Sequence, residues 1–138
     1  MNYLPEGWLE AVLAACSAAG TAICTAREVG GYTIQRKTDG RMVSAADRAA
    51  SRIVGQRLRA LDPALPVICE EGAQHAGGAT RFWLVDPLDG TREFLRGGEL
   101  FTVNVALVEN REPVFGVVHA PLVGATYWGL RGGGAWRN

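Results

Sequence analysis

Two stretches in the first half of the chain repeat apolar residues with the period of an α-helix. The first covers roughly residues 6–28 and ends before Gly30, and the second begins at Ser44 and ends before Pro63. Between them, residues 32–43 carry an Asp-Gly turn signal, which predicts a short hairpin or a loop. We therefore expect two N-terminal helices.

Beyond the second helix the pattern changes to the two-residue period of strands. It is clearest over residues 101–109, where apolar positions alternate with polar ones such as Thr102 and Asn104. Further strands are predicted over residues 66–69, 82–86, 113–121 and 125–132. This order predicts an α+β fold, with two N-terminal helices packed on a mainly antiparallel sheet. The final GGGAWRN predicts no closing element, so one sheet edge is expected to be open.

Composition and charge narrow the range of functions. The 138 residues, 48% of them hydrophobic, are enough for one core. Fourteen basic residues balance fourteen acidic ones, so no broad field favours a nucleic acid polymer or a membrane surface as partner. Three cysteines without metal-binding spacing favour a reducing cytoplasm. The apolar N-terminal stretch lacks a basic leading region and an unbroken run of roughly 18 residues, so we expect neither a signal peptide nor a membrane span.

The string WLVDPLDGTRE places two aspartates three positions apart at the end of a predicted strand. Asp86 and Asp89 lie on a turn that Pro87 and Gly90 define. Carboxylates this close repel each other unless a cation lies between them or their side chains point apart. Mg²⁺ prefers hard oxygen ligands and takes only one or two carboxylates from a protein. Asp86 could bridge two ions, with Asp89 and the Leu88 carbonyl serving them as further ligands.

The same turn offers a site for an anion. Gly90 and Thr91 open a predicted short helix, REFLRG, whose N–H groups could bind a phosphate beside the cations. The Thr91 hydroxyl could hydrogen-bond a water, with Asp47 or Glu70 accepting its proton. Activated water and neutralised phosphoryl charge are the elements of multi-metal phosphate hydrolysis.

Each of these elements also has a purely structural interpretation. DPLDGT contains ordinary turn formers, SAAD at residues 44–47 has capping-box spacing, and Glu70 with Glu71 could be a solvated pair. His75 and His119 have no partner at metal-binding spacing. The functional interpretation depends on the coincidence of acids, helix start and strand ends.

Three segments together resemble the motifs of the inositol monophosphatase superfamily of magnesium-dependent, lithium-sensitive phosphatases. They are WLVDPLDGTREF and, in order and spacing before it, VSAAD and ICEEG. The continuation GGELFTVNVALVENREPVFGVVHAP resembles the branch of 3'(2'),5'-bisphosphate nucleotidases of the CysQ type more than the inositol phosphatases proper. The resemblance implies the N-terminal lobe of a layered αβαβα sugar-phosphatase fold.

The resemblance also implies roles for the matching positions. The matching metal ligands are Glu70, Asp86, the Leu88 carbonyl and Asp89. Asp89, Gly90 and Thr91 match the phosphate-binding turn, and Thr91 with Asp47 matches the pair that orients the attacking water, which Glu70 also contacts. Lys37 aligns with a basic residue of a mobile loop. The implied cofactor is Mg²⁺, as two or three ions, with Li⁺ as an inhibitor.

One family motif has no counterpart in this chain. Family members are much longer, and their second half carries a WDxAAG motif whose aspartate completes the second metal site. Here Trp136 is followed by Arg137. We therefore interpret residues 1–138 as a single N-terminal lobe, with the C-terminal lobe absent.

The implied function is that of a magnesium-dependent phosphomonoesterase. When complete, it would hydrolyse the 3'-phosphate of adenosine 3',5'-bisphosphate to give AMP and phosphate. Its partner would be a phosphorylated small molecule, a nucleotide or a sugar phosphate, and no membrane would be required. The nearest alternative is an inositol-1-phosphate or fructose-1,6-bisphosphate phosphatase. An alternative of another class is a catalytically silent binding or assembly module that associates through its open sheet edge.

Overall fold

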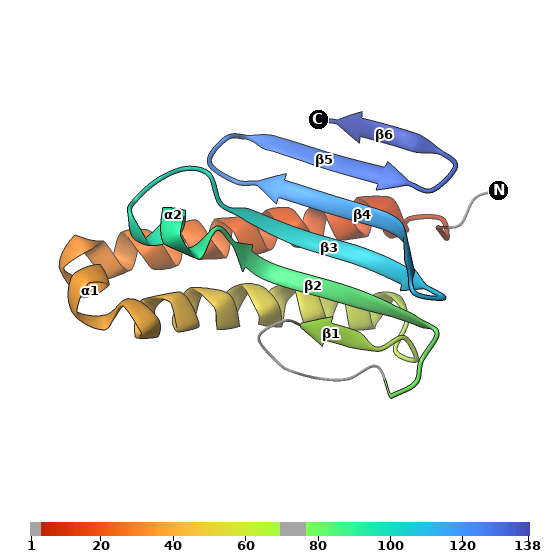
Figure 1. Ribbon diagram of the computed structural model, residues 1–138, viewed down its shortest axis with the longest axis horizontal. Helices are drawn as coiled ribbons and strands as arrows, with labels where there is room; N and C mark the ends of the chain where they lie inside the picture. The colour runs from red at the N-terminus through yellow and green to blue at the C-terminus, as the bar shows by residue number, and fades with distance from the viewer. Residues whose placement is uncertain (1–3, 70–76) are drawn as a thin grey trace.

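The chain forms helices on one face of a single sheet. The computed structural model describes residues 4–29, 45–69 and 77–138 in full, and residues 30–44 only as backbone. The elements are α1 (Trp8–Leu61), β1 (Val67–Cys69), β2 (Arg81–Asp89), α2 (Thr91–Leu95), β3 (Thr102–Glu109), β4 (Glu112–Ala120), β5 (Ala125–Leu130) and β6 (Gly134–Arg137). Figure 1 shows α1 lying behind the sheet. The predicted α+β class is confirmed.

The six strands are paired in chain order, from β1 at one edge to β6 at the other. Only the β1–β2 pair is parallel among the described strands. Asn110 and Arg111 connect β3 to β4 with φ of 51° and 69°, which is the two-residue turn whose twist matches a hairpin. The mainly antiparallel sheet predicted from the sequence is therefore confirmed.

One prediction about the sheet edge was wrong. The final residues, predicted to add no closing element, form β6, in which Trp136 pairs with Trp128 and stacks on it at 6.3 Å between ring centroids. The glycine run before Trp136 hid this strand, because glycine has a low strand propensity. Every residue of β6 is exposed, so the sheet still ends in an uncovered strand.

The two predicted helices are the two arms of α1, which the structure assigns as one element. Each arm carries one buried stripe with helical spacing. The stripes are Val12, Cys16, Ala19 and Ile23 in the first arm, and Ala46, Ala50, Val54 and Leu58 in the second. Both stripes belong to one core, and Figure 1 shows the two arms side by side behind the sheet. The loop predicted over residues 32–43 lies outside the fully described part of the chain.

The first arm has the length and composition of a membrane span. Within Trp8–Val29 the most apolar 18-residue window has a mean hydropathy of 1.5, and this is the one such stretch in the described part of the chain. Its apolar stripe, however, packs against the sheet. Packing in the core therefore explains the buried residues, which make up 33% of the window.

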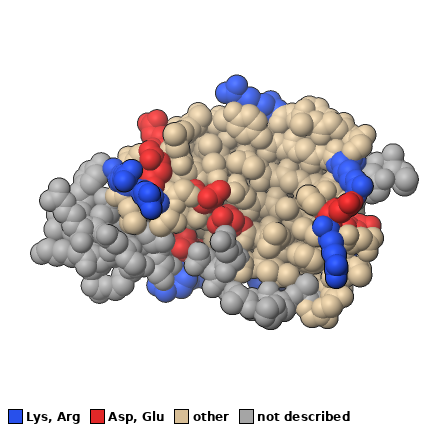
Figure 2. Space-filling model, in the orientation of Figure 1, with Lys and Arg blue, Asp and Glu red and all other residues tan. Residues whose placement is uncertain are grey.

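Helix α1 covers one face of the sheet and leaves the other face uncovered (Figure 1). Trp83, Val105 and Val117 face the helices and are almost fully buried. On the opposite face Leu84 and Val118 remain exposed, and no described helix lies over them. Figure 2 shows this face, with few charged side chains over its middle and a small acidic group over the end of β2.

Candidate active site at the end of strand β2

The two aspartates of the DPLD segment lie within β2, and not on a turn after it as the sequence had predicted. Asp86 pairs with Asn104 of β3, and Asp89 pairs with Thr102. β2 therefore advances three residues where β3 advances two, which is a β-bulge.

The bulge decides where the carboxylates point. In a regular strand, side chains three positions apart lie on opposite faces. Asn104 and Thr102 are two positions apart and share the face away from α1, so their partners Asp86 and Asp89 share it too. The inserted residue Leu88 turns inward instead and is 4% exposed. The bulge thus brings two carboxylates to one face while keeping an apolar anchor in the core.

Hydrogen bonds fix both carboxylates at the bulge. The Leu88 N–H donates to Oδ1 of Asp86 at 3.3 Å. Nδ2 of Asn104 donates to Oδ2 of Asp89 at 3.1 Å, and the Thr102 hydroxyl donates to Oδ1 of Asn104 at 3.0 Å. These bonds restrict the directions in which the two acids can turn.

Gly90 makes the turn from β2 into α2. Its φ of 94° lies in the left-handed region, where a side chain would be strained. A Cβ at this position would also lie 2.8 Å from the Leu100 carbonyl oxygen. The first helical residue, Thr91, is exposed beside Asp89. The short helix predicted from REFLRG is confirmed as Thr91–Leu95.

Asp47 reaches this end of the molecule from α1. It is buried, with 6% exposure, and Ser51 follows it by one helical turn on the same side of α1. Oγ of Ser51 lies 3.1 Å from Sγ of Cys69, and Cys69 pairs with Val85, the residue before Asp86. The helix turn after Asp47 therefore contacts the end of β1, beside the strand that carries the acids.

Two predicted site residues cannot be placed. Glu70 follows Cys69 directly and lies outside the described residues, and the side chain of Lys37 does as well. Within the described side chains, no group of three His, Cys, Asp or Glu residues lies close enough together to hold a metal.

The donor groups that are described nevertheless fit Mg²⁺. Asp86 and Asp89 supply carboxylate oxygens on one face, and Mg²⁺ usually takes one or two carboxylates and keeps several waters. Their register partners on β3 are Asn104 and Thr102, and not a cysteine or histidine, which would have favoured a softer metal.

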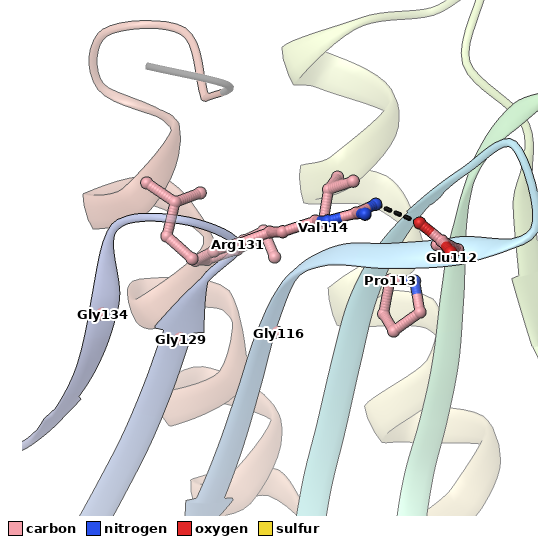
Figure 3. Close-up of a pocket in the computed structure, with 9 residues that line it drawn as sticks. Glu112, Pro113, Val114, Gly116, Gly129, Arg131 and Gly134 are labelled. Carbon is pink, nitrogen blue, oxygen red and sulfur yellow. Dashed lines mark hydrogen bonds and ion pairs between the residues drawn. The ribbon is translucent and has the colours of Figure 1, made fainter. Parts of the chain in front are cut away.

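A hollow lies elsewhere, at the opposite end of β4 and β5. It measures about 610 Å³, and Figure 3 shows Glu112, Pro113, Arg131 and three glycines around it. Arg131 forms an ion pair with Glu112 across it. The hollow exists because Gly116 and Gly129 face each other without side chains. It holds no nucleophile or acid pair, so we place the candidate site at the bulge.

Sequence reasoning missed three polar residues that support the site. Asn104 and Thr102 had a detectable signal, because the strand alternation put both on the polar face. Ser51 had only its helical spacing from Asp47 as a signal. None of the three was singled out, since their roles depend on pairings between distant segments.

Comparison with family models and curated proteins finds similar proteins over most of the chain. The model of the inositol monophosphatase family matches residues 5–138. The 3'(2'),5'-bisphosphate nucleotidase CysQ of Salmonella typhimurium is 45% identical over 109 residues, which are 75% of this chain and 43% of that protein. CysQ of Aggregatibacter actinomycetemcomitans is 39% identical over 111 residues, covering 77% of this chain and 41% of its own.

Solved structures agree in fold. CysQ from Bacteroides thetaiotaomicron, a bacterial member of the inositol monophosphatase family, superposes with a TM-score of 0.81 at 34% identity, over 94% of this chain and 48% of its own. The suhB protein from Bartonella henselae superposes with a TM-score of 0.80 at 30% identity, over 96% of this chain and 52% of its own.

The fold and the acidic bulge thus define an α+β protein with the architecture of solved inositol monophosphatase-family structures. The chain belongs to the inositol monophosphatase family. It spans less than half the length of the curated relatives it matches.

Proposed function

We propose that this chain is the N-terminal lobe of a magnesium-dependent phosphomonoesterase that removes the 3'-phosphate from adenosine 3',5'-bisphosphate. The observation that carries the proposal is the bulge, which sets Asp86 and Asp89 on one face directly before the Gly90 turn. The CysQ relatives support the nucleotide substrate, since they are named as bisphosphate nucleotidases. Residues 1–138 would form one lobe, with a C-terminal lobe as its counterpart.

The proposal assigns a task to each site residue. Asp86, Asp89, the Leu88 carbonyl and Glu70 hold Mg²⁺, which when bound supplies positive charge to the phosphoryl oxygens and acidifies water. The Gly90 turn lets a phosphate oxygen approach the backbone closely. Thr91 and Asp47 orient the attacking water and take its proton, assisted by Glu70. Lys37 would cover the substrate from a mobile loop.

Two finer features belong to the same proposal. The site would hold two or three Mg²⁺ ions, and Li⁺ would inhibit by competing for one of them. The compartment would be the cytoplasm, where the three free thiols stay reduced.

The direct test is phosphate release from adenosine 3',5'-bisphosphate and inositol-1-phosphate with Mg²⁺. The Asp89→Asn variant should lose activity, while Glu10→Gln, which removes one exposed carboxylate from the first turn of α1, should not. Preference for inositol-1-phosphate or fructose-1,6-bisphosphate would instead support the alternative phosphatases. Calorimetry with Mg²⁺ alone should show binding that Asp89→Asn weakens.

A chimera completes the test, because the chain is shorter than its relatives. Joining it to the part of Salmonella CysQ that it does not match should give an active nucleotidase that depends on Asp89. An inactive chimera that folds and binds no Mg²⁺ would contradict the proposal. Concentration-dependent self-association of the chain without any activity would favour the assembly module, with the exposed strand β6 as the pairing edge.

A further inference from the structure

Backbone hydrogen bonds hold the turn at the C-terminus of the short helix α2. Gly97 has a φ of 80°, and its N–H donates to the Phe94 carbonyl at 3.1 Å. The Gly98 N–H donates to the Glu93 carbonyl at 2.9 Å. These two bonds form a Schellman motif, which closes a helix C-terminus. The motif leaves further acceptor capacity on the Phe94 and Gly98 carbonyls.

Arg27, from the first arm of α1, uses this acceptor capacity. Its Nη1 donates to the Phe94 carbonyl at 3.2 Å and to the Gly98 carbonyl at 2.8 Å. Its guanidinium carbon lies 5.3 Å from the ring centroid of Phe94 and 5.0 Å from that of Phe101. A cation in this position interacts favourably with the negative end of the helix dipole and with the faces of the aromatic rings.

These contacts continue to the Gly90 turn. The Phe94 N–H donates to the Gly90 carbonyl at 2.9 Å. The Phe94 and Phe101 rings pack edge to face at 5.4 Å, and the Leu100–Phe101 backbone fills the space where a Gly90 Cβ would be. One guanidinium therefore touches both elements that enclose Gly90, α2 on one side and the segment before β3 on the other.

We propose that Arg27 is a positioning residue for the Gly90–Thr91 turn, acting through Phe94, Gly98 and Phe101. The proposal rests on the proposed function for the part that concerns phosphate, and on contacts alone for the part that concerns the turn. Lysine is an incomplete substitute, because its ammonium lacks the planar fork that lies over a ring while donating to fixed carbonyls.

Amide hydrogen exchange of the full chain tests the structural part. Arg27→Met should speed exchange over residues 91–98 about tenfold, since hydrogen bonds from a charged donor are lost, and Arg27→Lys should fall between Met and wild type. Arg81→Met is the matched control, because Arg81 also lies over an aromatic ring, Trp8 at 5.8 Å, and pairs with Glu109. Arg81 lies at the start of β2, away from the bulge. Its replacement should therefore leave the exchange rates of residues 91–98 unchanged. Unchanged exchange over 91–98 in both Arg27 variants, or equal acceleration throughout the protein, would overturn the proposal.

Titration with inorganic phosphate in the presence of Mg²⁺ tests the link to the site. Arg27→Met should weaken phosphate binding about tenfold and leave Mg²⁺ affinity unchanged, because β2 and β3 hold the acids independently of Arg27. Equal loss of both affinities would show general damage and contradict a positioning role. If wild type binds no phosphate, the proposed function fails, while the exchange data still decide the role of Arg27 in the turn.

Discussion

Asn104 donates a hydrogen bond to Asp89 from the neighbouring strand, with 3.1 Å between Nδ2 and Oδ2. The Asn104 amide is itself oriented, because its Oδ1 accepts from the Thr102 hydroxyl. The bulge makes this chain of bonds possible, since it brings Asp89 to the face on which Asn104 lies. Asn104 therefore sets the direction of a carboxylate that we propose as a metal ligand.

Replacing Asn104 by alanine should weaken Mg²⁺ binding. Removing a group that orients a metal ligand typically costs about 10–100-fold in affinity. Calorimetry with Mg²⁺ on the full chain measures the effect. Val118→Ala is the control, because Val118 pairs with Asn104 on the same sheet face without an acid as its register partner. Equal affinities in the Asn104 and Val118 variants would refute the orienting role.

Gly90→Ala should destabilise the fold more than Gly124→Ala. Both glycines have positive φ, 94° and 73°, so alanine is strained in either. At Gly124 a Cβ meets nothing within 4 Å, whereas at Gly90 it lies 2.8 Å from the Leu100 carbonyl oxygen. Overpacking should therefore add about 1–3 kcal/mol at Gly90. Urea unfolding of both variants measures the difference, and similar losses would show that the turn can move away from Leu100.

Much of the fold could be predicted because it depends on local periodicity. The helical stripes ending at Ile23 and Leu58, and the alternation around Val103 and Val105, are each set within one segment. The helix after Gly90 was predictable for the same reason, since its start signal lies in adjacent residues. The structure adds that both stripes face one core.

The geometry of the site could not be predicted in the same way. A bulge is a mismatch between two strands, so nothing in DPLDG alone distinguishes it from a turn. The contacts of Arg27 with Phe94 and Gly98 join residues 67 and 71 positions apart. The roles assigned to Asp47, Glu70 and Thr91 stay predictions.

Gly20→Ala should destabilise the protein, although alanine is the better helix former. A Cβ on Gly20 would lie 2.9 Å from Pro121 Cβ and 3.0 Å from the His119 ring, so α1 packs too closely on the end of β4 for a methyl group. Overpacking costs about 1–3 kcal/mol, which exceeds the roughly 0.5–1 kcal/mol gained in helix propensity.

Gly55→Ala is the matched control on the same helix. Its Cβ would be close only to the movable end of the Arg59 side chain, at 2.8 Å. We expect this variant to be as stable as wild type or up to about 1 kcal/mol more stable. In thermal unfolding Gly20→Ala should lower the Tm, whereas Gly55→Ala should leave it unchanged or raise it. A stabilised Gly20 variant would show that the helix is free to move away from the sheet.

His119 should make the protein less stable in mild acid. Its ring is half-buried, lies against Gly20 of α1 and hydrogen-bonds Thr126 of β5 through Nδ1 at 2.8 Å. Burial lowers the pKa of His119 from its usual value of 6.5. The unfolded chain therefore binds the proton more readily than the folded chain. The contribution of His119 to the free energy of unfolding is complete above pH 6.5 and is lost as the pH falls toward the folded-state pKa.

The comparison with His119→Asn isolates this effect, because the other titrating groups are the same in both proteins. The free energy of unfolding of wild type minus that of the variant should decrease as the pH falls from about 8 to about 5, the range in which histidine titrates. Urea unfolding at several pH values measures it. A difference that stays constant, or that grows in acid, would mean that folding does not disfavour the protonated His119 ring.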